Sequence, residues 1–181
     1  MINEGKQFEK DFTDSIPNYC YLHRLRDSAQ SFAKSTKYSW ENECDFFMFD
    51  GSSRLFYAIE CKSTKSKGMS FQRNKDEAER YKSRMIKYHQ IESLTKIAQY
   101  NGTIAGLLLN FRDEKNNMQR TYFIDIRNFN NLIRNTNKSS INEIDIIQYN
   151  AYKIQGEKKR VHYKWNIDSL LDEFTNRFYR K

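Results

Sequence analysis

The chain has 181 residues, enough for one domain with its own core, and its 13 Phe and 12 Tyr supply large packing units. A net charge of +8 favours an anionic partner, with nucleic acid ahead of a membrane surface, and we expect no membrane contact. No run reaches the roughly 20 apolar residues of a membrane span, no signal peptide opens the chain, and three scattered cysteines are typical of a reducing compartment. These features predict a cytoplasmic protein with a single domain over residues 1–181.

The first third of the chain predicts a helix, a strand and a hairpin. Residues 4–16 carry apolar side chains at helical spacing, and Pro17 ends that helix. Residues 19–25 resemble a strand, whereas the polar stretch 28–40 favours no element. Two apolar runs within residues 44–62 flank a turn signal of Asp-Gly type, which predicts a β-hairpin.

The rest of the chain alternates between helical and strand patterns. We expect a basic, hydroxyl-rich loop over 63–71 and a helix over 75–99 that ends at Asn101-Gly102. The further predicted elements are a strand buried on both faces (103–111), a strand (121–126), a short helix and a loop (128–140), strands (144–149, 151–154, 161–165), a basic turn (156–160) and an amphipathic helix (167–179). This order predicts an α/β fold with a mixed central β-sheet flanked by helices.

Two acids and a lysine interrupt the apolar strands of the hairpin. Asp45 lies in the first strand, and Glu60 and Lys62 close the second. Because side chains alternate along a strand, Glu60 and Lys62 share one face, and hairpin pairing can bring Asp45 beside them. Mg²⁺ prefers carboxylate oxygens and fills its other positions with water and phosphate oxygens. The pattern indicates a site for a hard divalent cation and a phosphate, in which Lys62 orients the attacking water or stabilises the transition state.

The same three residues also have a simpler interpretation. Asp45 could be a surface acid near the turn, and Glu60 and Lys62 could form an ion pair, since acid-x-Lys triplets are common in a chain with 30% charged residues. The apolar context favours the site, because charge within a buried strand is costly unless it is used or paired.

Basic residues outside the hairpin are candidates for contact with DNA. The loop after the hairpin and the basic turn near the end of the chain suit contacts with the phosphate backbone, which fix position without reading sequence. A solvated surface loop explains the composition equally well. The candidates are Lys65, Lys67, Ser70, Arg73, Lys158, Lys159 and Arg160.

Taken in order, these motifs resemble the PD-(D/E)xK nucleases, whose core is restriction-endonuclease-like, and within them the RecU-type Holliday-junction resolvases. The resemblance covers about residues 3–126. It runs through 3–9, Asp45, 58–65, Ser70-Phe71, His89-Gln90-Ile91-Glu92 and the strand 102–111. We expect residues 127–181 to complete the fold or the dimer.

The resemblance implies a role for each matching residue. Asp45 and Glu60 would be metal ligands, Lys62 would stabilise the transition state, Gln90 would lie at the metal site and Glu9 would be a supporting catalytic acid. It also implies Mg²⁺ as cofactor, with Mn²⁺ as a substitute. The implied partners are four-way DNA junctions, a second copy of the chain in a homodimer, and recombination or branch-migration proteins. A two-fold dimer provides the two matched cuts that a junction requires.

The chain departs from the family in three places. Glu43 stands where the family has a threonine ligand, so a third acid could supply an oxygen to the metal. Cys44 stands where the general motif has proline. The segment 21–43 is shorter than the family's stalk and lacks its proline, whereas 71–88 is longer and basic. Junction selectivity is therefore less firmly predicted than nuclease activity.

Two other functions fit parts of the same pattern. A sequence-specific restriction-type endonuclease shares this core and could read bases with residues 128–165. A non-catalytic protein that binds branched DNA explains the charge, but not the order of the acids and the lysine. The remaining chemical patterns are weaker: His89 fits helix packing better than a ligand role, and Cys20-x-x-His23 lacks a second pair for zinc.

Overall fold

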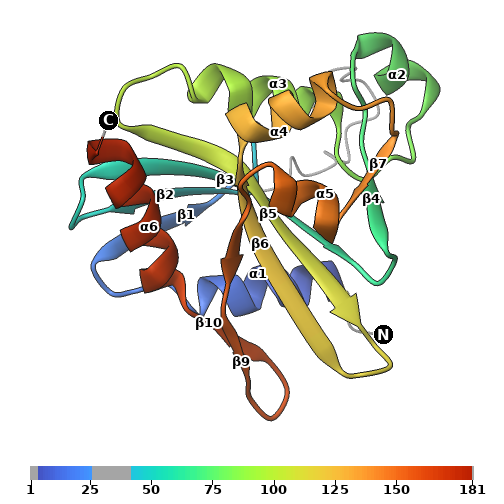
Figure 1. The fold of residues 1–181 in the computed structure, drawn as a ribbon. Helices are drawn as coiled ribbons and strands as arrows, with labels where there is room; N and C mark the ends of the chain where they lie inside the picture. Colours follow the sequence, from blue (N-terminus) through green and yellow to red (C-terminus); the bar gives the residue numbers. More distant parts are fainter. Residues whose placement is uncertain (1–3, 26–41, 181) are drawn as a thin grey trace, which may run out of the picture.

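The computed structural model describes residues 4–25 and 42–180. The polar stretch 28–40 lies outside the described residues. In the described part, a central β-sheet is covered by helices on both of its faces (Figure 1). The prediction of a mixed α/β fold is confirmed.

The helices and strands follow one another along the whole described chain. The helices are α1 (Glu4–Thr13), α2 (Lys75–Arg80), α3 (Tyr88–Ile97), α4 (Ile126–Arg134), α5 (Glu143–Gln148) and α6 (Ile167–Tyr179). The strands of the central sheet are β1 (Cys20–Arg24), β2 (Phe46–Asp50), β3 (Leu55–Thr64), β5 (Thr103–Asp113), β6 (Met118–Asp125) and β8 (Tyr152–Ile154). Two small ribbons pair β4 (Gly68–Ser70) with β7 (Ser140–Asn142) and β9 (Gly156–Lys158) with β10 (Tyr163–Trp165).

In the described residues the central sheet has the strand order β1-β2-β3-β5-β6-β8. β3 and β5 are parallel, and the other neighbours pair antiparallel. The parallel pair requires a crossover, which passes through β4, α2 and α3 before the chain enters β5. β5 is therefore a central strand, as its continuous apolar pattern predicts.

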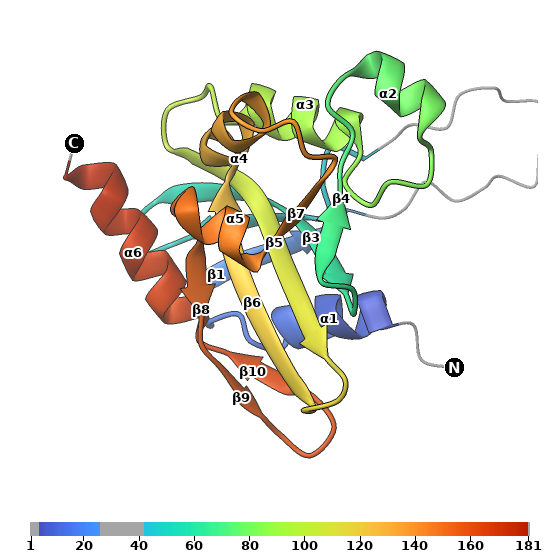
Figure 2. The ribbon, with the colours of Figure 1, turned by 45° about the vertical axis from the view of Figure 1, so that its right-hand side comes forward.

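Each face of the sheet has its own core. One core joins the odd-numbered apolar side chains of β3, such as Tyr57 and Ile59, to α1 and α6. The other joins Ala58 of the opposite face to α3, α4 and α5. Figures 1 and 2 show α3 and α4 next to each other, away from α1. Glu60 and Lys62 follow Ala58 at intervals of two, so they belong to the face that α3 covers.

The helix predicted over 75–99 is wrong, because the structure has two helices there with a turn between them. The side chain of Gln72 holds this turn from both sides. Its amide nitrogen donates to the carbonyl oxygen of Tyr81 at 2.9 Å, and its amide oxygen accepts from the N–H of Tyr88 at 2.8 Å. Ile86 in the turn is fully buried. The tertiary contacts of the turn therefore outweigh its helical pattern.

The strand predicted over 144–149 is also wrong, since the structure forms helix α5 there. Asn142 begins the helix: its side-chain oxygen accepts from the N–H of Asp145, and the carboxylate of Asp145 accepts from the N–H of Asn142, each at 3.0 Å. This reciprocal capping satisfies two N–H groups at the helix start. Within the helix, Ile146 packs into the core. Capping at the helix start therefore outweighs the strand propensity of the isoleucines.

Two predicted loops contain more strand than expected. In the stretch 63–71, β3 continues to Thr64 and β4 pairs with β7. The basic turn 156–160 begins with β9, so its charged residues stand on a short hairpin that projects from the molecule (Figure 2). Both basic segments are therefore held in defined positions.

The three cysteines are free thiols, with Cys44 and Cys61 buried and Cys20 half-buried. Cys20 and His23 both belong to β1, and at a spacing of three their side chains point to opposite faces of the strand. Across the described residues, every helix is too short or too polar to cross a membrane.

Gly106 provides a test of the sheet packing next to β3. A Cβ atom at this position would lie 2.4 Å from the carbonyl oxygen of Ile124 and 2.6 Å from Cζ of Phe123. We therefore expect Gly106→Ala to lower the free energy of unfolding by about 1–3 kcal/mol, the usual cost of overpacking. Urea denaturation measures this change. An unchanged free energy of unfolding would contradict the close approach of β5 and β6.

Candidate metal and phosphate site

The site lies where β2 begins and β3 continues beyond it. Phe46, the first residue of β2, pairs with Ile59 of β3. In the described residues, the part of β3 beyond this pair has β5 on one side only, so its other edge is open. Asp45 covers the start of this edge, because its carboxylate Oδ2 accepts the backbone N–H of Cys61 at 2.7 Å. This hydrogen bond fixes the Asp45 carboxylate beside the end of β3.

Glu60 lies at the centre of the polar cluster and is only 1% exposed. Its Oε1 atom accepts from the ammonium of Lys62 and from the amide nitrogen of Gln90, each at 2.5 Å. Gln90 is itself fixed at the start of α3, where its amide oxygen accepts from the N–H of Lys87 at 3.0 Å. The structure therefore brings Gln90 of α3 together with Asp45, Glu60 and Lys62 of the hairpin segment.

The electrostatics of the cluster are dominated by two neighbouring carboxylates, of which Glu60 is buried and Asp45 is half-buried. Burial and the neighbouring Asp45 raise the pKa of Glu60 to about 7, although Lys62 acts in the opposite direction. Burial also raises the pKa of Asp45, against the Cys61 N–H and the Lys62 charge. The pKa of Lys62 is raised, since the two carboxylates outweigh its burial. The positive charge of Lys62 therefore balances the negative charge of the two carboxylates only in part.

This donor set fits a small, hard cation. Within the described residues, no group of three or more His, Cys, Asp or Glu side chains has the arrangement of a metal site. Asp45 and Glu60 would therefore be the charged ligands, as is usual for Mg²⁺, which is held by one or two carboxylates and keeps several waters. A divalent cation would also offset the unfavourable proximity of these two carboxylates. Gln90 would orient Glu60, since its amide nitrogen faces that carboxylate.

Glu43 and Glu9 were predicted to join the same cluster. Glu43 is exposed two positions before Asp45, and among the described residues its carboxylate contacts neither Asp45 nor Glu60. Glu9 is half-buried on α1, and its Oε2 accepts from Nε and Nη2 of Arg24 at 3.0 and 2.8 Å. The charge of Glu9 raises the pKa of Asp45, and that of Arg24 lowers it, so this ion pair borders the site.

Arg24 is not among the residues predicted from the sequence. It is the last residue of β1 and lies opposite Phe46, the neighbour of Asp45. Pairing the predicted strand 19–25 with the hairpin would have placed an arginine close to Asp45. The sequence could therefore have indicated Arg24, but only with knowledge of the register between the two strands.

The first group of predicted DNA contacts follows β3. Lys65 and Lys67 are exposed in the turn before β4. Ser70 and Arg73 have internal partners instead: the Ser70 hydroxyl accepts from the N–H of Met85, and the Arg73 guanidinium donates to two backbone carbonyl oxygens near the end of α4 and beyond it. The structure gives Ser70 and Arg73 a role in holding the crossover, and their contact with DNA remains a prediction.

The second group lies on the hairpin of β9 and β10. Lys158, Lys159 and Arg160 are all exposed. The ammonium of Lys159 lies 2.6 Å from the carboxylate of Glu157 on the same hairpin. These three cations are accessible to an anionic partner, away from the open edge of β3.

Comparisons with known proteins find a prophage protein and a solved structure that are similar to this chain. No protein-family model matches it. It is 27% identical over 180 residues to the SPbeta prophage-derived uncharacterized protein YotM of Bacillus subtilis, covering 94% of this chain and 86% of that protein. A solved structure of Hjc, a Holliday junction resolvase from Archaeoglobus fulgidus, aligns with a TM-score of 0.49 at 17% identity, over 80% of this chain and 93% of the other.

Glu60→Gln tests the electrostatics of the site without a metal. A pKa raised from 4.5 to about 7 in the folded state means that Glu60 favours folding most below pH 4.5, and that this contribution is lost as the pH rises towards 7. In EDTA, we expect the wild type to lose stability relative to Glu60→Gln across this interval. Urea denaturation of both proteins at each pH measures the difference. Parallel pH profiles would contradict the burial of a charged Glu60.

Proposed function

We propose that this chain is a Mg²⁺-dependent DNA endonuclease with a PD-(D/E)xK-type core. The convergence of Asp45, Glu60 and Lys62 at an open strand edge is the observation that carries the proposal. A buried and a half-buried carboxylate beside one lysine are costly to a fold that makes no use of them. The net charge of +8 supports a polyanionic substrate.

Each residue of the site has a defined task in phosphodiester hydrolysis. Asp45 and Glu60 would hold the ion, and bound Mg²⁺ supplies a more acidic water and offsets charge on the phosphate. The Cys61 N–H and the Gln90 amide keep these two carboxylates in place. The oxygen of water would bond to phosphorus in line while the bond to the 3′ oxygen breaks, leaving a 5′-phosphate and a 3′-hydroxyl.

Lys62 supplies the positive charge at the reacting phosphate. Its ammonium is held by Glu60 and its side chain is 18% exposed, so it keeps access to solvent and to a substrate. In a partly desolvated site, a fixed ammonium stabilises developing negative charge more strongly than it does in water. Lys62 would orient the attacking water or stabilise the transition state.

We further propose that the substrate is a four-way DNA junction and that the active form is a homodimer. Support comes from the resemblance of residues 3–126 to RecU-type resolvases. An isologous dimer would present two identical sites to the two strands of a two-fold junction, as paired symmetric nicks require. Recombination or branch-migration proteins are natural partners of such an activity.

Asp45→Asn and Glu60→Gln test the metal ligands. Both variants retain a side-chain oxygen, so the amide that replaces the Asp45 carboxylate could still accept from the Cys61 N–H, and the fold should persist. We expect cleavage to slow by about a hundredfold or more, since metal stabilisation of several kcal/mol is lost. Single-turnover cleavage of a labelled junction in Mg²⁺ measures this rate.

Mg²⁺ binding gives an independent control for the same variants. A ligand of the folded state raises the melting temperature, so Mg²⁺ should stabilise the wild type more than either variant. Binding of DNA in EDTA should persist in both variants. Cleavage at the wild-type rate in either variant would show that the site is assigned to the wrong residues.

A labelled four-way junction and a matched linear duplex, each with Mg²⁺ or EDTA, test the choice of substrate. Paired symmetric nicks on the junction alone, lost in EDTA, are the expected result. Cleavage of the linear duplex at discrete positions would indicate a restriction-type enzyme instead. Junction binding without cleavage in any metal would indicate a non-catalytic binder.

A further inference from the structure

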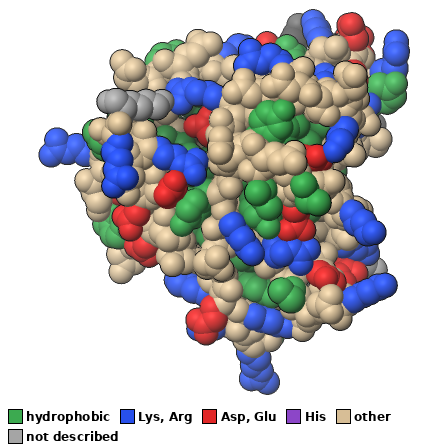
Figure 3. Space-filling model, in the orientation of Figure 1, with side chains coloured by type: hydrophobic (Ala, Val, Ile, Leu, Met, Phe, Trp, Pro, Cys, Tyr) green, Lys and Arg blue, Asp and Glu red, His purple; other side chains and the backbone are tan. Residues whose placement is uncertain are grey.

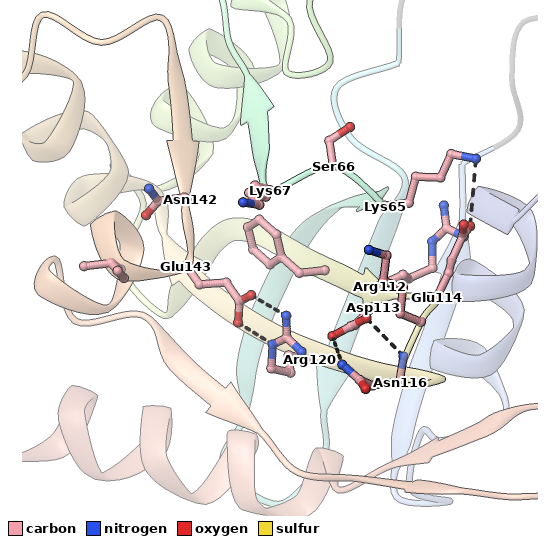
Figure 4. A pocket seen from close by; sticks show the side chains of 13 residues that line it. Lys65, Ser66, Lys67, Arg112, Asp113, Glu114, Asn116, Arg120, Asn142 and Glu143 are labelled. Carbon is pink, nitrogen blue, oxygen red and sulfur yellow. Dashed lines mark hydrogen bonds and ion pairs between the residues drawn. The ribbon is translucent and has the colours of Figure 1, made fainter.

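A second polar site, a hollow in the surface, lies beyond the end of β3, the strand that carries Glu60 and Lys62. It has a volume of about 630 Å³ and is formed by the turn between β3 and β4 and by the turn between β5 and β6, so we call it the turn cleft. Figure 4 shows the first turn on one side and the β5–β6 hairpin on the other. The polar side chains that line the cleft are Lys65, Ser66, Lys67, Arg112, Asp113, Glu114, Lys115, Asn116, Arg120, Asn142 and Glu143.

The turn cleft lies on the same face of the sheet as the candidate site. In the parallel register, Lys62 pairs with Leu109 and Thr64 pairs with Phe111. Phe111 lines the cleft, and since side chains alternate along a strand it shares a face with Lys62. The four residue steps from Glu60 to Thr64 span about 13 Å at the usual rise of a strand. One straight strand therefore connects the two sites.

The acids that line the turn cleft already have partners. Glu143 accepts two hydrogen bonds from Arg120 at 2.7 Å and one from the Tyr122 hydroxyl at 2.9 Å, and the bond to Arg120 lowers its pKa. Asp113 accepts from the backbone N–H and the side-chain amide of Asn116. These carboxylates are therefore satisfied within the protein, which reduces their repulsion of an anion.

The lysines around the turn cleft are much less engaged. Lys67 and Lys115 are exposed, and among the described residues neither ammonium has an ion pair or hydrogen bond. Lys65 approaches only Glu114, at 3.9 Å. In Figure 3, basic side chains are visible on the lower right of the molecule, where Figure 1 shows the end of the β5–β6 hairpin. Lysines on flexible stems bind phosphate as point charges, without selecting a base.

We propose that the turn cleft binds the DNA backbone a few nucleotides from the scissile phosphate, through Lys65, Lys67 and Lys115. The inference rests on the proposed nuclease function and extends it to a second contact. The 13 Å of strand is several times the rise of about 3.4 Å per nucleotide along a duplex, so this contact falls a few nucleotides from the cut and not at the scissile phosphate itself. Lys67 and Lys115 are then positioning residues, which hold the substrate so that its phosphate reaches Lys62.

The double variant Lys67→Ala/Lys115→Ala tests the contact through the salt dependence of binding. Each lost phosphate contact reduces the slope of log affinity against log salt by about one, so we expect a reduction of about two. Fluorescence anisotropy of a labelled junction and a labelled duplex in EDTA, between about 50 and 200 mM salt, measures this slope. Both lysines are exposed, and an unchanged free energy of unfolding verifies the fold.

A matched control removes two positive charges elsewhere. Lys96 and Arg134 are exposed on the outer surface of α3 and α4. The double variant Lys96→Ala/Arg134→Ala has the same net charge as the test variant, and we expect it to keep the wild-type slope. Equal slopes in the test and control variants would overturn the proposal, because net charge alone would then explain the loss.

A neutral methylphosphonate at single positions of the DNA tests the distance. In the wild type, the substitution should weaken binding most a few nucleotides from the cut, and in Lys67→Ala/Lys115→Ala, where only Lys65 remains of the three lysines, the effect there should be smaller. An equal effect in both proteins would overturn the proposed contact. If the wild type cleaves the junction but the lysine variant behaves like the control, the proposed lysine contact is wrong and the proposed nuclease function stands. If the wild type neither binds nor cleaves DNA, the proposed function is wrong as well.

Discussion

The hydrogen bond between the Cys61 N–H and the Asp45 carboxylate is the contact on which the candidate site depends. β3 extends beyond the start of its partner β2, so the N–H of Cys61 would otherwise lie at an unpaired strand edge. A carboxylate satisfies the donor and is thereby fixed beside Glu60. The arrangement places two acids in a poorly solvated position, where Lys62 offsets their repulsion only in part. A divalent cation at this site would offset the remaining repulsion.

The parallel pairing of β3 with β5 organises everything around that contact. Because the strands are parallel, the chain must cross over one face of the sheet, and the crossover brings α3 above β3. The amide nitrogen of Gln90, at the start of α3, can then donate a hydrogen bond to the Glu60 carboxylate. The same pairing aligns the far ends of both strands, so that the turns after Thr64 and Asp113 enclose the turn cleft. The position of Glu60 under α3 and the position of the turn cleft are thus two consequences of one register.

The parts of this structure that depend on neighbouring residues can be predicted from local sequence patterns. Alternation along a strand and a short turn place Asp45, Glu60 and Lys62 together, because hairpin pairing joins residues that are close in the chain. The helical spacing over 4–16 and 167–179 predicted α1 and α6, which cover one face of the sheet. Local periodicity also predicted β5, whose continuous apolar pattern requires burial on both faces.

The features that depend on distant partners cannot be predicted from local patterns, because they form only in the assembled fold. The helix predicted over 75–99 divides because Gln72 binds both ends of the intervening turn, a bond pattern that no local periodicity encodes. The pairing of Arg24 with Glu9 needs β1 and α1 to be placed against each other. The turn cleft likewise unites lysines from two turns that are adjacent only through the β3–β5 register. Local propensity acts within a few residues, whereas these contacts exist only after the sheet has assembled.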